Sequence, residues 1–535
     1  MKAKKIISFI VSTLLLFSIT GCGTKQVAST PTQRVLTDEE IATIADKIPD
    51  YSSSGKQYQF FGYSSVSNGR WTDFGVDYYC GQDLMTVEQF TMYKDAGFTI
   101  MHPQGIAGIQ AADNFVYSSS QLKKVLDLAQ ESGIDKVIVP DYRITGMIAG
   151  MSTGMQAAKE QKFDTYEDTY GVFTDDGQID QTALENKLKE FMGEYVQHPS
   201  FYGVNLNDEP GAKVFEAYGE VYRAIKRVYP QSFTLANLHP PAGFKDALLA
   251  DILPTLEDIA EFSETSFAER LAAWKVYITQ FLEKTGIDYL MYDQYPVDDK
   301  GLHDLYIRGL QIAAEVCKEK GVEFCFVAQT CTINNTRTID AETADWLNNI
   351  LIGMGVKTIG YFTYFDRDSN DAENYYDGGG FVTHFGEKTK VYDIMQKVMY
   401  NNQKFAPTIL SFDYNASNVY IAEGTNKYMN TYILNGSCNA TFAKVSNVAV
   451  NKESALVSEL INKNDNRYMY MIQNIVDPIY TGSASYQTTT LTFNEGYNYA
   501  VVWSNGERQV VSLVNNQYTV TQHPGQAVYV IPFNA

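Results

Sequence analysis

The chain has 535 residues, of which 45% are hydrophobic and 20% are charged, a composition typical of a globular protein with a large core. This length exceeds one ordinary domain and fits a large α/β unit followed by a smaller one. Asp and Glu (63) outnumber Lys and Arg (42), so the formal net charge is −21. Nucleic-acid binding requires a basic surface, and this balance therefore argues against a nucleic-acid partner.

Residues 1–21 have the pattern of a secretory signal peptide. A lysine-rich start (residues 2–5) precedes an apolar run (6–19) that is too short for a membrane-spanning helix. The sequence Ile-Thr-Gly-Cys that ends at Cys22 resembles a bacterial lipobox, which implies cleavage before Cys22 and a lipid on its sulfur. We therefore predict lipid anchoring at the extracytoplasmic face of the cell membrane, with residues 22–56 forming a linker that contains a short helix.

From residue 57 to 402, apolar strand-like runs alternate with amphipathic helical patterns. Several helical patterns end at a glycine just before the next strand, as at Gly97 and Gly321. Eight strands that alternate with helices through right-handed crossovers close into a (β/α)₈ TIM barrel. An open doubly wound sheet is the alternative, but no glycine-rich phosphate loop follows the first strand. The predicted strands are 58–64, 98–103, 136–140, 202–206, 232–238, 289–292, 323–327 and 358–362, and the predicted helices are 86–96, 119–132, 181–195, 214–228, 267–285, 302–320 and 341–354.

The sequence pattern changes in residues 403–535, which consist of short β-branched and aromatic runs separated by turn residues. This rhythm predicts a C-terminal β-sandwich domain. Since the region holds no concentrated acid or histidine cluster, packing and stability are its expected role, with sugar binding as the alternative. The predicted strands are 418–422, 428–434, 467–473, 488–493, 499–503, 509–513 and 527–532.

The most informative stretch is the run from Phe201, which ends in Asp208 and Glu209 and is stopped by Pro210. Proline has no N–H to donate, so it ends the strand there. Such an apolar run reads as a buried parallel strand that brings Glu209 to its carboxyl end, where barrels build active sites. An acidic turn after a strand is the plainer alternative.

Polar and aromatic residues follow the other predicted strands as well. Two carboxylates around a sugar acetal are the usual equipment for glycoside hydrolysis, one protonating the leaving oxygen and the other acting as nucleophile or base. Tyrosine is abundant at 38 residues, and its ring can stack on a sugar face. His102 is a further candidate for contacting sugar hydroxyls. The residues that we predict to bind substrate are Asp141, Asn205, Asn207, Asp208, His239, Tyr292, Gln329, Tyr364 and Asp366.

Two stretches of the chain, the motif Asn-Asp-Glu209-Pro and the residues from Trp346 to Phe365, resemble a known group of proteins. Residues 57–402 resemble bacterial glycoside-hydrolase-like (β/α)₈ barrels related to the clan of beta-galactosidases and cellulases. In that clan the general acid is a Glu after Asn at the end of strand four, so the resemblance implies this role for Glu209, although Asp208 replaces the Asn. The clan's nucleophile is a Glu at the end of strand seven, where this sequence has Gln329.

Glutamine can be neither nucleophile nor base, so a second carboxylate has to come from another strand. Asp293, at the end of strand six, is the predicted partner of Glu209, and the two intervening strands leave room for a water, which suggests inversion. Asp208 is expected to face away from Glu209 if the strand alternates regularly. Asp340 and Glu342 lie where the next helix begins and are expected to cap it.

Two functions remain open from the sequence. The first is a lipid-anchored extracytoplasmic glycoside hydrolase that acts on an oligosaccharide or polysaccharide with Glu209 as general acid. The second is a non-catalytic carbohydrate-binding lipoprotein on a hydrolase scaffold, which the missing strand-seven Glu supports. We predict no cofactor and no metal site, since the cysteines lack zinc spacing, Cys325 and Cys331 are expected in the core, and the acidic loop 366–371 matches a calcium loop only in part.

Overall fold

The structure is a computed structural model, and it describes residues 33–66, 70–73, 76–103, 108–111, 114–117, 119–241, 267–298, 301–302, 305–332, 337–366, 379–422, 440–480, 482 and 485–535. The predicted signal peptide, Cys22, the predicted strand at 428–434 and most of the acidic loop after residue 366 lie outside these ranges. None of the described helices is long and apolar enough to cross a membrane.

Eight parallel strands form one closed sheet, so the predicted TIM barrel is confirmed. Each strand pairs with the next one along the chain, and β15 pairs back with β2. Between β10 and β11 the ring closes through a parallel bridge, where Leu238 N–H donates to Met291 O at 3.0 Å. Each strand overlaps one predicted strand: β2 (Gln59–Gly62), β5 (Ile100–Met101), β8 (Val137–Val139), β9 (Phe201–Asp208), β10 (Phe233–Asn237), β11 (Tyr289–Gln294), β14 (Glu323–Gln329) and β15 (Thr358–Phe362).

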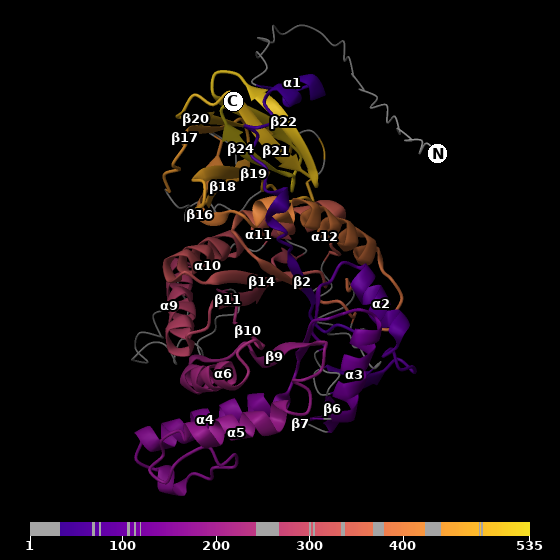
Figure 1. Cartoon of the computed structure of the whole chain (residues 1–535), viewed down its shortest axis with the longest axis vertical. Helices are drawn as coiled ribbons and strands as arrows, with labels where there is room; N and C mark the ends of the chain where they lie inside the picture. The colour runs from indigo at the N-terminus through magenta and orange to yellow at the C-terminus, as the bar shows by residue number, and fades with distance from the viewer. Residues whose placement is uncertain are drawn as a thin grey trace, which may run out of the picture.

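Helices surround this sheet, as Figure 1 shows. Their caps follow the sequence: Asp340 accepts from Thr343 N–H at 2.8 Å and so begins α11, as expected of a capping acid. Gly321 ends α10 in the left-handed conformation, with φ 69°. The helices are α2 (Val87–Asp95), α3 (Ser119–Glu131), α4 (Tyr142–Lys159), α5 (Gln181–Met192), α6 (Phe215–Val228), α9 (Phe267–Thr285), α10 (Tyr306–Lys320), α11 (Ala341–Gly353) and α12 (Lys390–Ile409).

Helix α4 was not predicted, because glycines interrupt its apolar pattern. In the structure these glycines make room for aromatic rings of the following segment. A Cβ added to Gly154 would lie 2.6 Å from the Phe173 ring, and one added to Gly146 would lie 2.7 Å from the Tyr170 hydroxyl. The sequence alone does not show which rings fill these gaps, so the residues read as helix breakers.

Small two-stranded hairpins follow three of the barrel strands in the chain. They are β3 (Arg70–Asp73) with β4 (Val76–Tyr79) after β2, β6 (Gly108–Ala111) with β7 (Asn114–Tyr117) after β5, and β12 (Val297–Asp298) with β13 (Gly301–Leu302) after β11. All three leave from the carboxyl ends of their barrel strands, the face at which TIM barrels bind their ligands.

Two antiparallel sheets form the C-terminal β-sandwich, as predicted. They enclose a core that includes Val457, Tyr470, Leu491 and Val530. The larger sheet has the order β1 (Gln33–Val35), β22 (Glu507–Leu513), β21 (Tyr499–Ser504), β24 (Ala527–Phe533), β19 (Arg467–Asn474), β18 (Ser454–Asn462), β16 (Asp413–Ile421), and the smaller one has the order β17 (Val445–Val450), β20 (Gln487–Phe493), β23 (Gln517–Gln522).

Strand β1 is a finding that the sequence did not predict. Residues 22–56 were expected to form a linker with a short helix, and the helix is present as α1 (Asp38–Thr43). The residues before it, however, pair antiparallel with β22 and so add an edge strand to the larger sheet of the sandwich. Three residues are too few for a recognisable alternating pattern.

Barrel and sandwich are in direct contact through α11 and α12, which lie between them in Figure 1. Trp346 of α11 donates its indole N–H to Ile475 O at 3.1 Å, and Gln473 Nε2 donates back to Trp346 O at 3.0 Å. A single hydrophobic cluster extends from the barrel into the sandwich and includes Met471 and Ile531. The division of the chain at residue 402 stays a prediction, and α12 runs across it.

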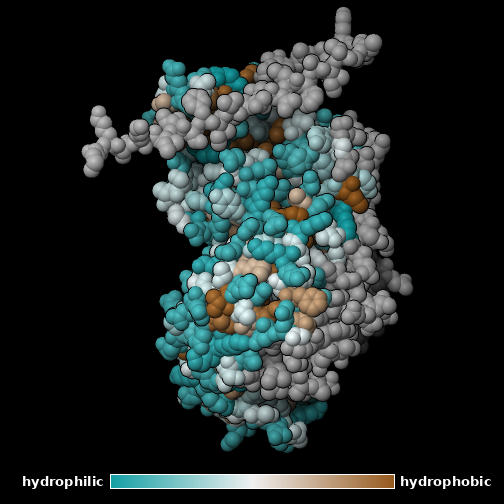
Figure 2. Space-filling model, turned by 90° about the vertical axis from the view of Figure 1, so that its right-hand side faces the viewer, coloured by the Kyte–Doolittle hydropathy of each residue, from teal (hydrophilic) through white to brown (hydrophobic). Residues whose placement is uncertain are grey.

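On one face of the molecule, the described residues form a largely polar surface. Figure 2 shows a face on which hydrophobic residues form separate spots among hydrophilic ones. Large exposed apolar side chains include Tyr400, which is 64% exposed, and Phe385, which is 47% exposed. Isolated exposed apolar residues are normal and need no partner.

Candidate active site

Three neighbouring strands bring their end residues together at the barrel mouth. Asn237, the last residue of β10, donates from Nδ2 to Asp208 Oδ1 of β9 and to Asp293 Oδ1 of β11, each at 3.0 Å. Because both oxygens bond to the same nitrogen, they can be no farther apart than twice that distance. Strand β10 lies between β9 and β11 in the closed ring, which is why one amide reaches both carboxyl groups.

Glu209 lies beside this group and holds an unusual backbone conformation. Its φ is 48°, a left-handed value that is rare for a residue with a side chain. Its N–H donates to Asn237 O at 2.7 Å, and its Oε2 lies 3.4 Å from His239 Nδ1. The alternation of β9 is interrupted by an extra residue at Leu206, where the pairing with β10 shifts, and by the left-handed turn at Glu209, and Asp208 joins the same mouth. Strained residues of this kind concentrate at functional sites.

Asp293 is buried, and its surroundings favour the protonated carboxyl. Burial is the largest cause that raises its pKa well above the ordinary value, and the negative charges of Glu209 and Asp208 raise it further. Hydrogen bonds from Tyr295 and Asn237 act in the opposite direction but are smaller. The mouth therefore combines a carboxyl group that tends to keep its proton with the 40%-exposed side chain of Glu209.

Aromatic rings form a wall next to the carboxyl groups. The Tyr63 ring centroid lies 4.6 Å from that of His102, and Tyr295 stacks on Phe362 at 5.3 Å. Burial and the charge of Asp208 raise the pKa of Tyr63 well above its usual range. Sequence reasoning missed Tyr63, Asn237 and Tyr295, although each lies at or next to the end of a predicted strand, the signal that selected the other residues.

His102 and Asn205 meet inside the barrel. Asn205 Nδ2 lies 3.1 Å from His102 Nε2, although β8 separates their strands, so the contact crosses the barrel interior. Burial lowers the pKa of His102 to about 3, and the ring is therefore neutral. Since the amide nitrogen is a donor, Nε2 accepts and the ring proton is on Nδ1. Asn207 instead accepts the N–H of Asp208 at 2.8 Å and shapes the end of β9.

The structure gives Asp141 a structural contact in place of the predicted substrate contact. It is fully buried and begins α4. Arg143 donates to both of its carboxylate oxygens, Nε to Oδ1 at 2.9 Å and Nη2 to Oδ2 at 2.8 Å, and Tyr195 OH donates to Oδ2 at 2.9 Å. These partners occupy the carboxylate, so it offers no open acceptor to a sugar.

Tyr292 and Tyr364 were predicted in the mouth, but both pack in the layer between strands and helices. The Tyr292 ring lies 4.9 Å from Trp274 of α9, and the Tyr364 ring lies 4.8 Å from Tyr93 of α2. Side chains alternate along a strand, so a residue next to a mouth residue points outward. Asp366 donates its N–H to Val382 O at 2.8 Å, and the residues that follow it are not among those described.

Gln329 sits where the resemblance would require a nucleophile, and its side chain is already engaged. Its Oε1 accepts from Val297 N–H at 2.8 Å, while its Nε2 donates to Val297 O at 3.0 Å and to Cys331 O at 3.1 Å. The amide thus pairs with the backbone of β12 like another strand. Gln329 thus fixes the segment that follows β11. Its amide oxygen and nitrogen are already hydrogen-bonded to the backbone, so the structure does not support the prediction that Gln329 binds substrate.

A metal or cofactor site was not expected. Within the described ranges, no group of three or more His, Cys, Asp and Glu side chains gathers in a way that could hold a metal ion. Cys325 and Cys331 are buried in the core, as the sequence indicated.

Comparison with known proteins adds the following. No protein-family model and no curated protein sequence matches the chain. Among solved structures, a family 39 glycoside hydrolase of Bacteroides cellulosilyticus WH2 matches 91% of this chain and 83% of its own, with 12% identity and a TM-score of 0.40. The endo-β-1,4-mannanase of Thermotoga petrophila matches 88% and 98%, with 12% identity and a TM-score of 0.38. An Anoxybacillus α-amylase matches 91% and 99%, with 11% identity and a TM-score of 0.46. At these values the matches do not bear on activity, which rests on the site itself.

Proposed function

We propose that this protein is a glycoside hydrolase that acts on an oligosaccharide or polysaccharide at the carboxyl end of its barrel. The observation that carries the proposal is the meeting of Asp208, Glu209 and Asp293 beside an aromatic wall, with Asp293 in surroundings that favour its proton. Cleavage of a sugar acetal needs one protonated group near the leaving oxygen and one carboxylate near the anomeric carbon or a water. This mouth supplies both kinds.

The two roles can be assigned in two ways. The sequence motif assigns the general acid to Glu209, with Asp293 as its partner. The burial of Asp293 favours the opposite assignment, because the group that keeps its proton is the better donor to the leaving oxygen. Glu209, more exposed and 3.4 Å from His239, would then activate water or attack the sugar. In both assignments Glu209 and Asp293 form the reacting pair, and Asn237 orients Asp293 through a hydrogen bond to its Oδ1.

The decisive experiment compares Glu209→Gln and Asp293→Asn in a screen of glycan panels and aryl glycosides. Each variant should lose about 10²–10⁴ in rate. The variant that lacks the acid should keep most of its activity on dinitrophenyl glycosides, whose leaving group needs no proton. The variant that lacks the base or nucleophile should lose activity on dinitrophenyl glycosides as well, because these substrates still need the attacking group.

Two controls sharpen this comparison. Glu507→Gln, on the sandwich and 3.5 Å from Lys404, should keep wild-type turnover because it lies far from the mouth along β22. Wild-type turnover in both mouth variants would refute the mechanism. So would a full panel on which the unaltered protein releases no sugar.

A second function has its own supporting observation. Because Gln329 is committed to the backbone of Val297, the position that holds a nucleophile in the resembling clan is chemically inert. The same mouth would then bind a carbohydrate without cleaving it. A glycan-binding measurement separates the two: a binder retains a ligand in the wild type without releasing product, and Glu209→Gln changes affinity only.

The N-terminal pattern supports a location for either function. We propose that Cys22 carries a lipid and holds the protein at the outer side of the cell membrane. The basic, apolar and Ile-Thr-Gly-Cys segments that support this lie outside the described residues.

A further inference from the structure

The mouth has buried hydrogen-bond acceptors that the protein leaves open. Asn205 Oδ1 and Asn237 Oδ1 are shielded from solvent and have no partner. Their residues are only 8% and 3% exposed. A buried carbonyl without a partner is unfavourable, so such atoms in a mouth point to a ligand that donates. The Nδ1 of His102, which carries the ring proton, is buried without a partner as well, and a sugar hydroxyl can accept from it.

The electrostatic surroundings of the mouth are negative. Burial is the largest cause that raises the pKa values of the nearby Tyr63 and Tyr277, and the carboxylates of Asp208 and Glu209 raise those of Tyr63 and Tyr277, respectively, further. Among the described residues, no lysine or arginine forms an ion pair with Glu209 or Asp293, and Glu209 has only His239 at 3.4 Å. His102 adds no positive charge because its pKa is about 3. A ligand that brings a positive charge would be attracted here.

Aromatic faces complete this environment. The ring centroids of Tyr63 and Phe362 lie 6.1 Å apart, and the Tyr295 ring stacks on Phe362 with a centroid distance of 5.3 Å. The faces of such rings attract cations as well as the apolar face of a sugar. Carboxylates, open carbonyls and ring faces together are the environment that an ammonium group prefers.

We propose that the sugar bound in this mouth carries a protonated amine, as a glucosamine unit does. This inference deepens the proposed function and rests on its carbohydrate substrate class. An ammonium has three donors and no acceptor, which matches Asn205 Oδ1, Asn237 Oδ1 and the carboxylate of Glu209. A neutral hydroxyl matches the same acceptors without the charge, and an acidic sugar would be repelled.

Three matched ligands test the proposal by calorimetry at pH 6: the β-1,4-linked trisaccharides of glucosamine, N-acetylglucosamine and glucose. They share linkage and length and differ at the 2-substituent. The glucosamine trisaccharide should bind at least about tenfold more tightly, a difference of about 1.4 kcal/mol. The preference should weaken as salt is added.

Variants separate a specific site from a general attraction, because a protein of net charge −21 attracts any cation. Glu209→Gln and Asn237→Ala should each reduce the preference for the amine and leave binding of the glucose trisaccharide less affected. Glu507→Gln, which removes one charge from the sandwich, should leave the preference intact. A preference that survives both mouth variants would overturn the inference.

The outcome for the amine is distinguishable from the outcome for hydrolysis. Equal or tighter binding of the neutral trisaccharides overturns the amine inference, even if they are cleaved. A clear preference for the amine without release of product supports the inference while the hydrolase proposal fails. Absence of binding to all three ligands overturns the inference as well.

Discussion

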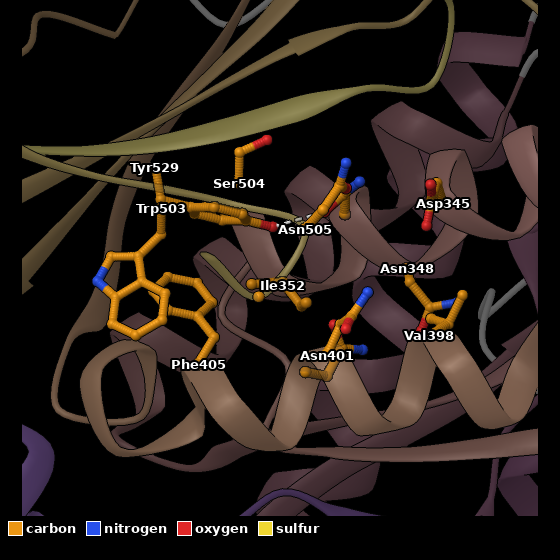
Figure 3. A pocket seen from close by; sticks show the side chains of 13 residues that line it. Asp345, Asn348, Ile352, Val398, Asn401, Phe405, Trp503, Ser504, Asn505 and Tyr529 are labelled. Carbon is orange, nitrogen blue, oxygen red and sulfur yellow. Dashed lines mark hydrogen bonds between the residues drawn. The ribbon is translucent and has the colours of Figure 1, made fainter. Parts of the chain in front are cut away.

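Asp345 offers a quantitative test of how barrel and sandwich fit together. It lies on α11 in a small cleft that α12 and the turn between β21 and β22 complete, and Figure 3 shows it facing Asn401 and Asn505 across that cleft. Burial raises its pKa to about 6, with a further rise from Glu342, while His523 and Lys397 lower it in part. The groups around Asp345 thus do not fully compensate its charge.

The raised pKa of Asp345 determines how the stability of the protein changes with pH. The folded-state pKa lies above the ordinary value of 3.8, so the folded protein binds more protons than the unfolded chain between about pH 4 and pH 6. Stability is therefore lost as the pH rises through that interval. A shift of about two units corresponds to at most about 3 kcal/mol at pH 7 and above, from about 1.4 kcal/mol for each unit.

Asp345→Asn replaces the charged carboxylate by a neutral group of the same shape. We expect this variant to unfold with a free energy up to about 3 kcal/mol higher at pH 8 and nearly unchanged at pH 4. Urea denaturation of both proteins from pH 4 to pH 8 measures the difference. Asp393→Asn, an exposed acid on α12, is the matched control and should change stability little at any pH.

One pattern of results would refute this reasoning. If Asp345→Asn were destabilising at pH 8, or if its effect were the same at pH 4 and pH 8, then the carboxylate would not be under strain in the cleft. The neighbouring asparagines would in that case hold the charge through hydrogen bonds, and the cleft would be a stabilising contact for the ionised form.

Two further predictions rest on hydrogen bonds of Gln329 and Asn237, and a third rests on the N-terminal sequence around Cys22. Gln329→Glu places a carboxylate against the carbonyls of Val297 and Cys331 and should lower the free energy of unfolding by about 2–5 kcal/mol. Gln329→Met should lower it less. Equal effects of the two variants in chemical denaturation would contradict the role of the two hydrogen bonds that the Gln329 amide donates. Asn237→Ala removes a hydrogen bond that lowers the pKa of Asp293, so the alkaline limb of the pH–rate profile should move to higher pH if Asp293 is the acid, and an unmoved limb would count against that assignment. Cys22→Ser should release the protein from membranes in a fractionation assay, and an unchanged membrane fraction would exclude the lipid as the anchor.

The barrel could be predicted because its strands are continuous apolar runs bounded by turn residues. Strands buried on both faces show this pattern in any surroundings, so β9, β11 and β14 were found with small errors at their ends. Helix α4 was missed because its glycines have a meaning only against Tyr170 and Phe173, which follow later in the chain. Strand β1 was missed because its partner lies at the other end of the sequence.

The sequence predicted where the candidate site lies better than it predicted which residues form it. The rule that residues after parallel strands meet at one face selected Glu209, Asp208 and Asp293. It could not tell which neighbour on a strand points inward, so Tyr292 was chosen together with Asp293, and Tyr295 was missed. It also could not tell that the carboxylate of Asp141 already has partners, because Arg143 meets it only after α4 has formed.

The pairing of β1 with β22 has a consequence for how the protein is made. Arg34 and Ser512, which contact each other in the sandwich, are 478 positions apart. At about 5–20 residues per second, a ribosome needs roughly half a minute to a minute and a half to travel that distance. The first strand of the sandwich therefore emerges long before its partner exists, and the whole barrel is synthesised in the meantime. Strand β1 therefore cannot pair with β22 until nearly the whole chain has been made.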